Sequence, residues 1–317
     1  MEYNLPICEM EQGMRVEGFY LLKDAFVKKA SNGKLYLNAT VMDCTSSITV
    51  MMWDYSGSID EQDVGSVIKV RGDVTLYKNA YQITASRLRL ATDEDDFDLS
   101  RLVPVAPIDT DMRYQEVVSL VESVEDEDYR AVAREMLRRH ADAFRSIPAA
   151  KSVHHSFISG LLMHTSNMLK TADFFAALYP DVIDRSLLIT GTLLHDFAKE
   201  REFAFSGVGM ATGYTVEGEL LGHLVMGAQE IAGVCRELEI PEEKSVLLQH
   251  LILSHHGNPE YGAAVVPMTA EAELLSLIDR VDSRMEIYGE ILPTLSPNSF
   301  SARIYALDKK IFRHEAE

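Results

Sequence analysis

Two kinds of hydrophobic spacing divide the chain. Between residues 14 and 91, apolar and polar residues alternate, which is typical of half-buried strands. The second to fifth of five expected strands are residues 34–41, 48–53, 67–74 and 80–90, with turn residues between them. A short helix is expected at residues 58–63, between the third and fourth strands. Five short strands with one helical insertion predict a small closed barrel.

The second half of the chain changes to helical spacing. Apolar residues recur every three or four positions over residues 113–145 and again from residue 150 onward. One long stripe runs from Leu220 to Leu238, and residues 205–218 interrupt the pattern and are expected to form a loop. We therefore expect three parts: a barrel in residues 1–91, an acidic linker with helices in residues 92–149, and an all-α helical bundle in residues 150–317.

The barrel has the strand pattern of the oligonucleotide/oligosaccharide-binding (OB) type, in which the second and third strands carry the ligand face. Tyr36 and Trp53 lie on the outward positions of those strands. We expect their rings to stack on bases, with Lys34 near the phosphate backbone. The alternative is that this face packs against the second domain.

The dipeptide His195-Asp196 ends an apolar helix in the second half. A buried imidazole and carboxylate are costly without partners, and a metal ion is the usual partner. Taken singly, His164 or His223 is more often a hydrogen-bonded core residue. The ordered set favours metal ligation. Its seven members are His164, His195, Asp196, His223, His255, His256 and Asp279.

The seven residues suffice for two metal ions, because the two oxygens of Asp196 can ligate one ion each. The first ion would take His164, His195, Asp196 and Asp279, and the second would take Asp196, His223, His255 and His256. Imidazole and carboxylate suit Mn, Fe, Co, Ni or Zn. Two ions about 3.5–4 Å apart would activate a hydroxide and clamp a phosphate for in-line attack.

Lys199 follows Asp196 by three residues and projects to the same side of the helix. We expect it to act in catalysis by holding a phosphate oxygen as a point charge. The alternative is a surface salt bridge with Glu200 or Glu202.

Four other residues complete the predicted site. Asp282 lies three positions after Asp279, and we expect it to orient a ligand histidine. His155 either contacts substrate or begins the first helix of the domain. Arg280 and Arg284 are weaker candidates for a phosphate contact than Lys199, and of the two we include Arg280 in the predicted site.

Bulk composition limits the functional classes. The 317 residues have a net charge of -19, which by itself disfavours a nucleic-acid partner, but the acid is densest at residues 93–98 and 122–128, outside both functional stretches. The three cysteines are far apart, which argues against a disulfide framework. No apolar run reaches the roughly 18 residues that span a bilayer, and the start lacks a signal peptide. We expect a cytoplasmic protein without a membrane partner, and the sequence is compatible with a homo-oligomer.

The ordered ligand set resembles the HD-domain phosphohydrolase superfamily over residues 150–290, and His223, His255 and His256 resemble its two-metal branch. The whole chain is similar to the YhaM family of bacterial 3'-to-5' exoribonucleases, which join an OB domain to an HD domain. The matching stretches are residues 154–165, 194–199 and 254–257. Ser159 and Ala198 stand where that family usually has glycine. The resemblance implies a nuclease dependent on Mn or Co that acts on single strands.

The leading hypothesis is a metal-dependent 3'-to-5' exonuclease that hydrolyses single-stranded RNA with a metal-activated hydroxide, and the residues leave single-stranded DNA open as a substrate. The first alternative is a phosphohydrolase of small nucleotides or cyclic dinucleotides, with the barrel as a regulatory or dimerising element. The second alternative is a non-catalytic nucleic-acid-binding module whose metals are structural.

Overall fold

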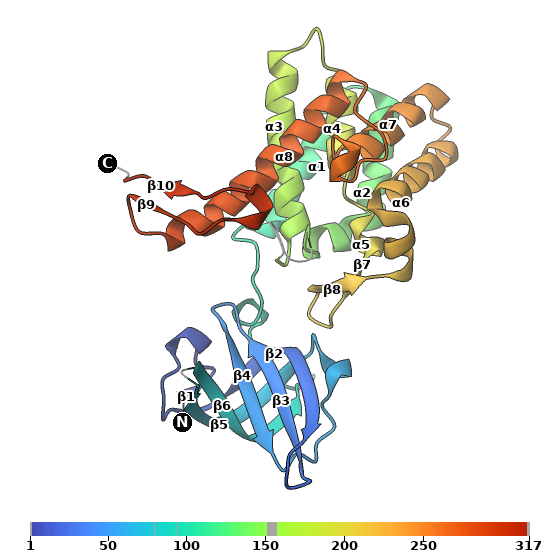
Figure 1. The fold of residues 1–317 in the computed structure, drawn as a ribbon. Coiled ribbons are helices and arrows are strands. Elements are labelled where there is room, and N and C mark those ends of the chain that lie inside the picture. The colour runs from blue at the N-terminus through green and yellow to red at the C-terminus, as the bar shows by residue number, and fades with distance from the viewer. Residues whose placement is uncertain (1, 79, 93, 151–156, 316–317) are drawn as a thin grey trace. The chain divides into compact units, whose positions relative to one another are not determined.

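The computed structural model describes the chain except residues 1, 79, 93, 151–156 and 316–317. It divides into two compact units (Figure 1). The first unit comprises Met1–Val105 with Phe205–Thr212, and the second comprises Ala106–Ala204 with Gly213–Glu317. No helix of the described residues is long and apolar enough to cross a membrane.

The first unit contains a closed five-stranded barrel of the OB type. Its strands are β2 (Arg15–Lys29), β3 (Leu35–Met42), β4 (Ser47–Trp53), β5 (Val67–Tyr77) and β6 (Ala80–Leu90). β2 pairs with both β3 and β5, and β4 and β6 pair in parallel, so the sheet closes on itself. This confirms the predicted fold. Around the barrel lie β1 (Glu2–Tyr3), η1 (Ile7–Glu9), η2 (Glu61–Asp63) and η3 (Leu99–Arg101), where η2 is the expected helical insertion, reduced to a single turn.

Strand alternation places the core inside the barrel. Leu37, Ala39 and Val41 of β3 are fully buried, and Val50 of β4 faces them from the neighbouring strand. Leu35 has the same place in the alternation as these residues, but it is 47% exposed because it lies at the very start of β3. Most outer positions of β3 and β4 carry polar or aromatic residues, among them Tyr36, Asn38 and Trp53.

The second unit is a helical domain (Figure 1). Its helices are α1 (Thr110–Glu122), α2 (Glu127–Ser146), α3 (Gly160–Leu178), α4 (Arg185–Leu194), α5 (Lys199–Glu202), α6 (Val216–Glu237), α7 (Glu242–Ser254) and α8 (Ala270–Ile291). Short elements follow α7 and α8: η4 (Pro259–Tyr261), η5 (Leu292–Thr294), β9 (Ser299–Phe300), η6 (Tyr305–Leu307) and β10 (Phe312–Arg313).

The predicted loop at residues 205–218 is wrong in part. It contains most of a hairpin, β7 (Phe203–Phe205) with β8 (Ala211–Tyr214), and the first turn of α6. The predicted stripe from Leu220 is also interrupted, because Gly222 has a φ of 70° and kinks α6. Leu220 therefore points to solvent with 78% of its surface exposed. A positive φ is accessible to glycine at little cost, so this kink depends on the residue type.

Candidate metal centre

The ends of two buried helices bring the first histidines together. Asp184 accepts a hydrogen bond from the Leu187 N–H and so begins α4, whose residues 186–194 are all buried. α4 packs on α7 at Gly191, where a Cβ would lie 2.2 Å from Leu251 Cδ2. Because the helices approach this closely, the residues that follow them meet.

His195 follows α4 and His255 follows α7, and their ring centroids lie 5.1 Å apart. Both rings are almost fully buried. The two adjacent pairs, His195-Asp196 and His255-His256, thus lie at the same end of two packed helices.

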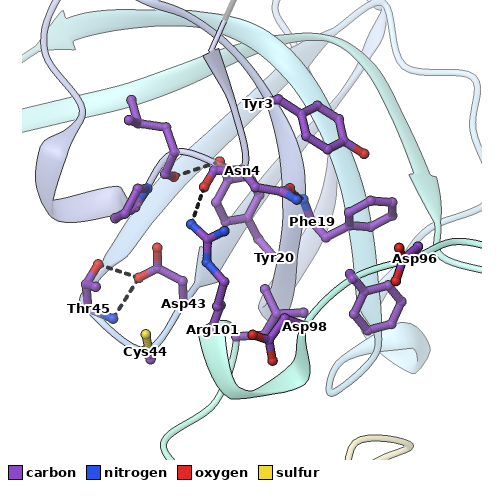
Figure 2. Close-up of a pocket in the computed structure, with 14 residues that line it drawn as sticks. Tyr3, Asn4, Phe19, Tyr20, Asp43, Cys44, Thr45, Asp96, Asp98 and Arg101 are labelled. Carbon is purple, nitrogen blue, oxygen red and sulfur yellow. Dashed lines mark hydrogen bonds between the residues drawn. The ribbon is translucent and has the colours of Figure 1, made fainter.

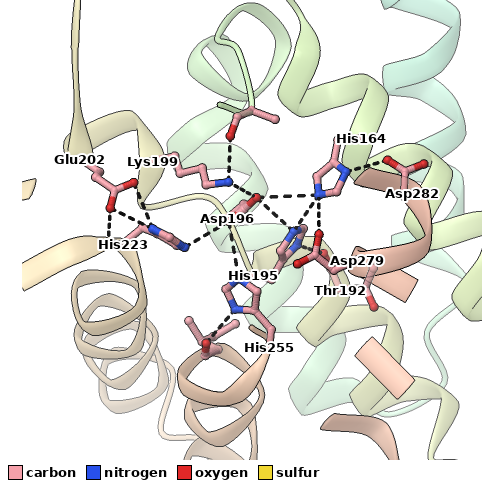
Figure 3. A network of polar contacts seen from close by, with 12 residues as sticks. His164, Thr192, His195, Asp196, Lys199, Glu202, His223, His255, Asp279 and Asp282 are labelled. Atoms are coloured by element: carbon pink, nitrogen blue, oxygen red, sulfur yellow. Dashed lines mark hydrogen bonds and ion pairs between the residues drawn. The ribbon is translucent and has the colours of Figure 1, made fainter. Parts of the chain in front are cut away.

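Asp196 lies at the centre of the cluster and is 2% exposed (Figure 3). Its Oδ2 is 3.2 Å from Nε2 of His195 and 3.9 Å from Nε2 of His164. Its Oδ1 is 3.5 Å from Nε2 of His223 and 3.7 Å from Nε2 of His255. The two oxygens of one carboxylate therefore face two different groups of imidazoles.

Each of these four imidazoles donates its Nδ1 hydrogen to an oxygen atom, which directs Nε2 toward Asp196 (Figure 3). The pairs are His164 with Asp282 (2.7 Å), His195 with Thr192 O (2.7 Å), His223 with Glu202 (2.9 Å) and His255 with Ile252 O (2.8 Å). These bonds set both the ring orientation and the tautomer.

Two further residues complete the predicted set. Asp279 of α8 has its Oδ1 3.4 Å from His164 Nε2. The ring of His256 lies 4.4 Å from that of His255 and 5.1 Å from that of His223, between centroids. The structure thus brings all seven predicted ligand residues into one cluster, in which His256 and Asp279 are partly exposed and the others are buried.

Several buried polar atoms of this cluster have no hydrogen-bond partner in the described part of the chain. They are Asp196 Oδ1, His223 Nε2, His255 Nε2 and His256 Nδ1. Unsatisfied buried polar atoms are rare in folded proteins, since each costs about 1–3 kcal/mol. Their convergence indicates that a ligand of the protein, and not another side chain, satisfies them.

A divalent metal fits this donor set. Two groups have ligand atoms within 4.8 Å of one another: His223, His255 and His256, and His164, His195 and Asp196. Neutral imidazole nitrogen with carboxylate oxygen is the usual ligand combination for first-row transition ions. The residues present are sufficient for such an ion beside each oxygen of Asp196.

Burial and neighbouring charges set the protonation of the cluster. Burial holds the pKa of His255 well below its usual value and lowers that of His256 to about 4, so both are neutral. Burial also lowers the pKa of His164, but Asp279 and Asp282 outweigh it and raise that pKa to about 9. A proton and a metal cation compete for the same Nε2, so metal binding at His164 releases a proton.

Lys199 is largely buried and binds within the cluster. Its Nζ donates to Asp196 Oδ2 at 2.6 Å and to Ala149 O at 2.8 Å. The surface salt bridge with Glu200 or Glu202 is therefore not what the structure shows. Although burial raises the pKa of Asp196, the charges of Lys199 and His195 hold it well below its usual range.

A cavity of about 380 Å³ opens beside the cluster. Its lining includes Asp196 and His256 from the cluster, and Tyr261, Arg280 and Arg284 from η4 and α8. Arg280, predicted as a phosphate contact, thus lies at this cavity. His155 lies outside the described residues.

The barrel carries a separate group of predicted residues. Tyr36 and Trp53 pair across β3 and β4 with ring centroids 5.1 Å apart, and Trp53 is 55% exposed. They line a groove of about 480 Å³ with Tyr77 and Tyr81, which flank the β5–β6 turn. Lys34 is close by in sequence but forms an ion pair with Asp54 at 2.8 Å.

A second barrel cavity, at the N-terminal arm, contrasts with the metal centre (Figure 2). Its one buried carboxylate, Asp43, accepts hydrogen bonds from Ile7 N–H, from the N–H and hydroxyl of Thr45, and from Ser46 N–H. Both oxygens are satisfied, so the side chain needs no added ligand.

The sequence analysis did not predict the contact of Glu202 with His223, or the places of Tyr77, Tyr81 and Tyr261 at the barrel groove and the metal-centre cavity. Glu202 accepts hydrogen bonds from both the N–H and Nδ1 of His223, and it can do so because the kink at Gly222 turns that N–H toward α5. The signal in the sequence that could have indicated Glu202 is its position six residues after Asp196, at the end of a helical turn. Tyr77 and Tyr81 lie near the strand ends on either side of the β5–β6 turn, and Tyr261 ends the single turn η4, so no periodicity singles them out.

Two family models match parts of the chain. Residues 161–284 match the HD domain, and residues 23–91 match the OB-fold nucleic acid binding domain. HD domains bind divalent metals and indicate metal-dependent phosphohydrolases, and OB-fold domains bind single-stranded nucleic acids.

Several solved structures are similar to this chain. A domain of replication protein A from Methanococcus maripaludis is 16% identical, with a TM-score of 0.25, and covers 28% of this chain and 94% of its own. A replication protein A heterotrimer bound to single-stranded DNA is 19% identical, with a TM-score of 0.21, and covers 29% and 72%. By its two family matches, the chain combines an HD phosphohydrolase domain with an OB-fold nucleic-acid-binding domain.

Proposed function

We propose that this protein is a 3'-to-5' exonuclease of single-stranded RNA, active also on single-stranded DNA, that depends on two divalent metal ions, most simply Mn. The observation that carries the proposal is the placement of Asp196, whose two oxygens each face a separate imidazole group. When bound, such metals activate water and stabilise the charge that develops on a phosphate.

The chain's own residues have distinct parts in this proposal. Asp279 and the five histidines hold the ions, while Asp282 and Glu202 fix the rings of His164 and His223. Lys199 keeps Asp196 ionised inside the protein. Arg280 lies at the cavity wall, where its guanidinium can bind a phosphate oxygen of the strand.

The barrel would bind the strand outside the metal centre. Exposed aromatic rings bind single strands by base stacking, each worth about 1–3 kcal/mol. The exposed ring of Trp53, beside Tyr36, is suited to that role. RNA as the substrate and the 3'-to-5' direction are supported by the resemblance of residues 154–165, 194–199 and 254–257 to the YhaM family.

The direct test incubates the full-length protein with 5'-labelled single-stranded RNA and Mn. We expect a ladder of progressively shorter labelled products, and a 3'-phosphorothioate block that stops the ladder at full length. His195→Ala is the inactive control. Unchanged RNA in Mn, Co, Fe, Ni and Zn would rule out the nuclease.

A second function is favoured by the cavity itself. A volume of about 380 Å³ is in the usual range for a small-molecule site, which fits a single nucleotide or part of a cyclic dinucleotide. Hydrolysis of such substrates without shortening of RNA would support this alternative. Binding of RNA without hydrolysis of any phosphodiester would support a binding module with structural metals.

A further inference from the structure

One wall of the cavity at the metal centre is made of residues that hold no metal in the proposed set. Ser276, Arg280, Ser283 and Arg284 of α8 all line it. Ser276, Ser283 and Arg284 each lie three or four positions from Arg280, so they share one face of the helix with it. Tyr261, from the turn after α7, lines the cavity with them.

The two arginines of this wall are available to an anion. In the described part of the chain, neither Arg280 nor Arg284 has a carboxylate oxygen within 4.0 Å. Other arginines of the same unit are paired, such as Arg185 with Asp173 at 2.7 Å. Guanidinium groups one helical turn apart present two forked donors to the same side, which is suited to phosphate oxygens.

Tyr261 is held in place by backbone geometry. It ends η4, a single turn that lies between Gly257 and Gly262, with φ of 82° and 102°. A Cβ on Gly257 would lie 2.8 Å from Ser276 Oγ, so the turn is pressed against α8. The Tyr261 N–H also donates to Asn258 O at 2.9 Å.

The ring of Tyr261 is both exposed and associated with an arginine. It is 61% exposed, and the Arg280 guanidinium lies 5.4 Å from the ring centroid. An aromatic ring beside a guanidinium is a common platform for a nucleobase, since both surfaces stack on π systems. The metal-facing side of the cavity would then receive the phosphate attached to that base.

We propose that Tyr261, Arg280 and Arg284 form a nucleotide subsite that binds a nucleoside monophosphate unit, with the base on the tyrosine ring and phosphate oxygens on the guanidinium groups. If the subsite binds the last nucleotide of a nucleic-acid strand, the proposal rests on the proposed nuclease function. If it binds a free nucleotide, the proposal does not require that function.

Binding of small ligands tests the base contact without turnover. Adenosine monophosphate and ribose 5-phosphate are titrated calorimetrically into full-length protein loaded with Mn. We expect adenosine monophosphate to bind about tenfold more tightly, because only it has a base to stack. Tyr261→Ala should remove this difference, Tyr261→Phe should keep it, and Tyr179→Ala, at an exposed tyrosine outside the cavity, should have no effect.

The arginines are tested by the same titration and by salt. The double variant Arg280→Gln/Arg284→Gln should weaken both ligands about equally. With RNA, the slope of log(kcat/KM) against log salt should become shallower by about 1.4, because each phosphate contact on a single strand contributes about 0.7. Arg236→Gln, an exposed arginine of α6 that does not line the cavity, is the matched control.

Each outcome decides the proposal. Equal affinity for the two ligands in the wild type, or a base preference that survives Tyr261→Ala, would overturn the subsite. An unchanged salt slope in the double variant would remove the arginines from it. If a base preference depends on Tyr261 but RNA is not shortened, the subsite stands and the exonuclease proposal fails.

Discussion

Two buried aspartates, one in each unit, differ in how their oxygens are satisfied. Asp43 of the barrel has both oxygens occupied by donors from its own loop and the N-terminal arm. Asp196 of the helical unit has one oxygen bound by Lys199, while the other lies near two imidazoles with no hydrogen bond in the described chain. Burial of a charge alone therefore does not mark a functional site. A functional site is marked by a buried charge together with convergent polar atoms that have no hydrogen-bond partner.

The same contrast holds for the units as a whole. Asp43 is the buried charged residue among the described residues of the barrel unit, whose other chemical features lie on its surface. The helical unit buries a cluster of imidazoles and carboxylates. We therefore expect single substitutions in the helical cluster to have large effects, and substitutions on the barrel face to have small effects.

The largest expected effect comes from Asp196→Asn. The amide keeps the shape of the side chain but loses the negative charge that faces both imidazole groups. The catalytic rate should therefore fall about a thousandfold, which corresponds to several kcal/mol of lost transition-state stabilisation. Hydrolysis of bis(p-nitrophenyl) phosphate and bound metal per protein measure the change. Asp43→Asn is the matched control and should retain rate and metal. Equal losses in the two variants would contradict the contrast.

The second-largest expected effect is on stability and comes from a charged histidine that is not one of the predicted metal ligands. His140 lies buried between Glu200 and Glu230, at 2.6 and 2.9 Å, and despite burial these carboxylates raise its pKa to about 9. Its folded pKa is above the unfolded value, so the stabilisation is complete below about pH 6.5 and is lost as pH rises through about 9. At its maximum, the raised pKa of His140 contributes about 3 kcal/mol to the free energy of unfolding.

Urea unfolding of the wild type and of His140→Gln, at pH 6, 7.5 and 9.5, measures this effect. The difference in the free energy of unfolding of the helical unit should shrink steadily as pH increases. A difference that is constant over this range would show that His140 is not charged in the folded protein.

Loss of a ring-orienting contact should have a smaller effect than loss of a ligand. Asp282→Asn weakens the hold on the His164 ring, so the metal concentration for half-maximal activity should increase about 10- to 100-fold. Excess metal should restore most of the rate. Asp308→Asn, at an exposed aspartate of the same unit, should leave the metal requirement unchanged. A loss of rate that excess metal does not rescue would assign Asp282 a direct role instead.

The smallest effect is expected on the barrel. Trp53→Ala removes one stacking surface, so the affinity for single-stranded RNA should fall about tenfold, as measured by fluorescence anisotropy. Trp53→Phe retains a ring and should recover most of the affinity. If Trp53→Ala binds RNA as the wild type does, this face does not contact the strand.

Local pattern explains how much of the fold was predictable. Alternation in β3 and β4 reports directly on which side of a strand is buried, so the barrel could be predicted from residues such as Leu37, Ala39 and Val50. The hairpin at residues 203–214 could not, because strands of three and four residues are too short to show a period. The kink at Gly222 was missed for a related reason: one residue of unusual φ leaves the helical spacing on both sides intact.

The sequence by itself determined the chemical types, since adjacent His-Asp and His-His pairs after apolar helices are unusual enough to indicate ligands. Only the tertiary structure decided how they are used. It placed Lys199 on Asp196 and Glu202 on His223, and it brought Tyr261 to Arg280. These pairings depend on helix ends and turns that meet through packing. Spacing along the chain determines which residues share a helix face, but not which faces come together.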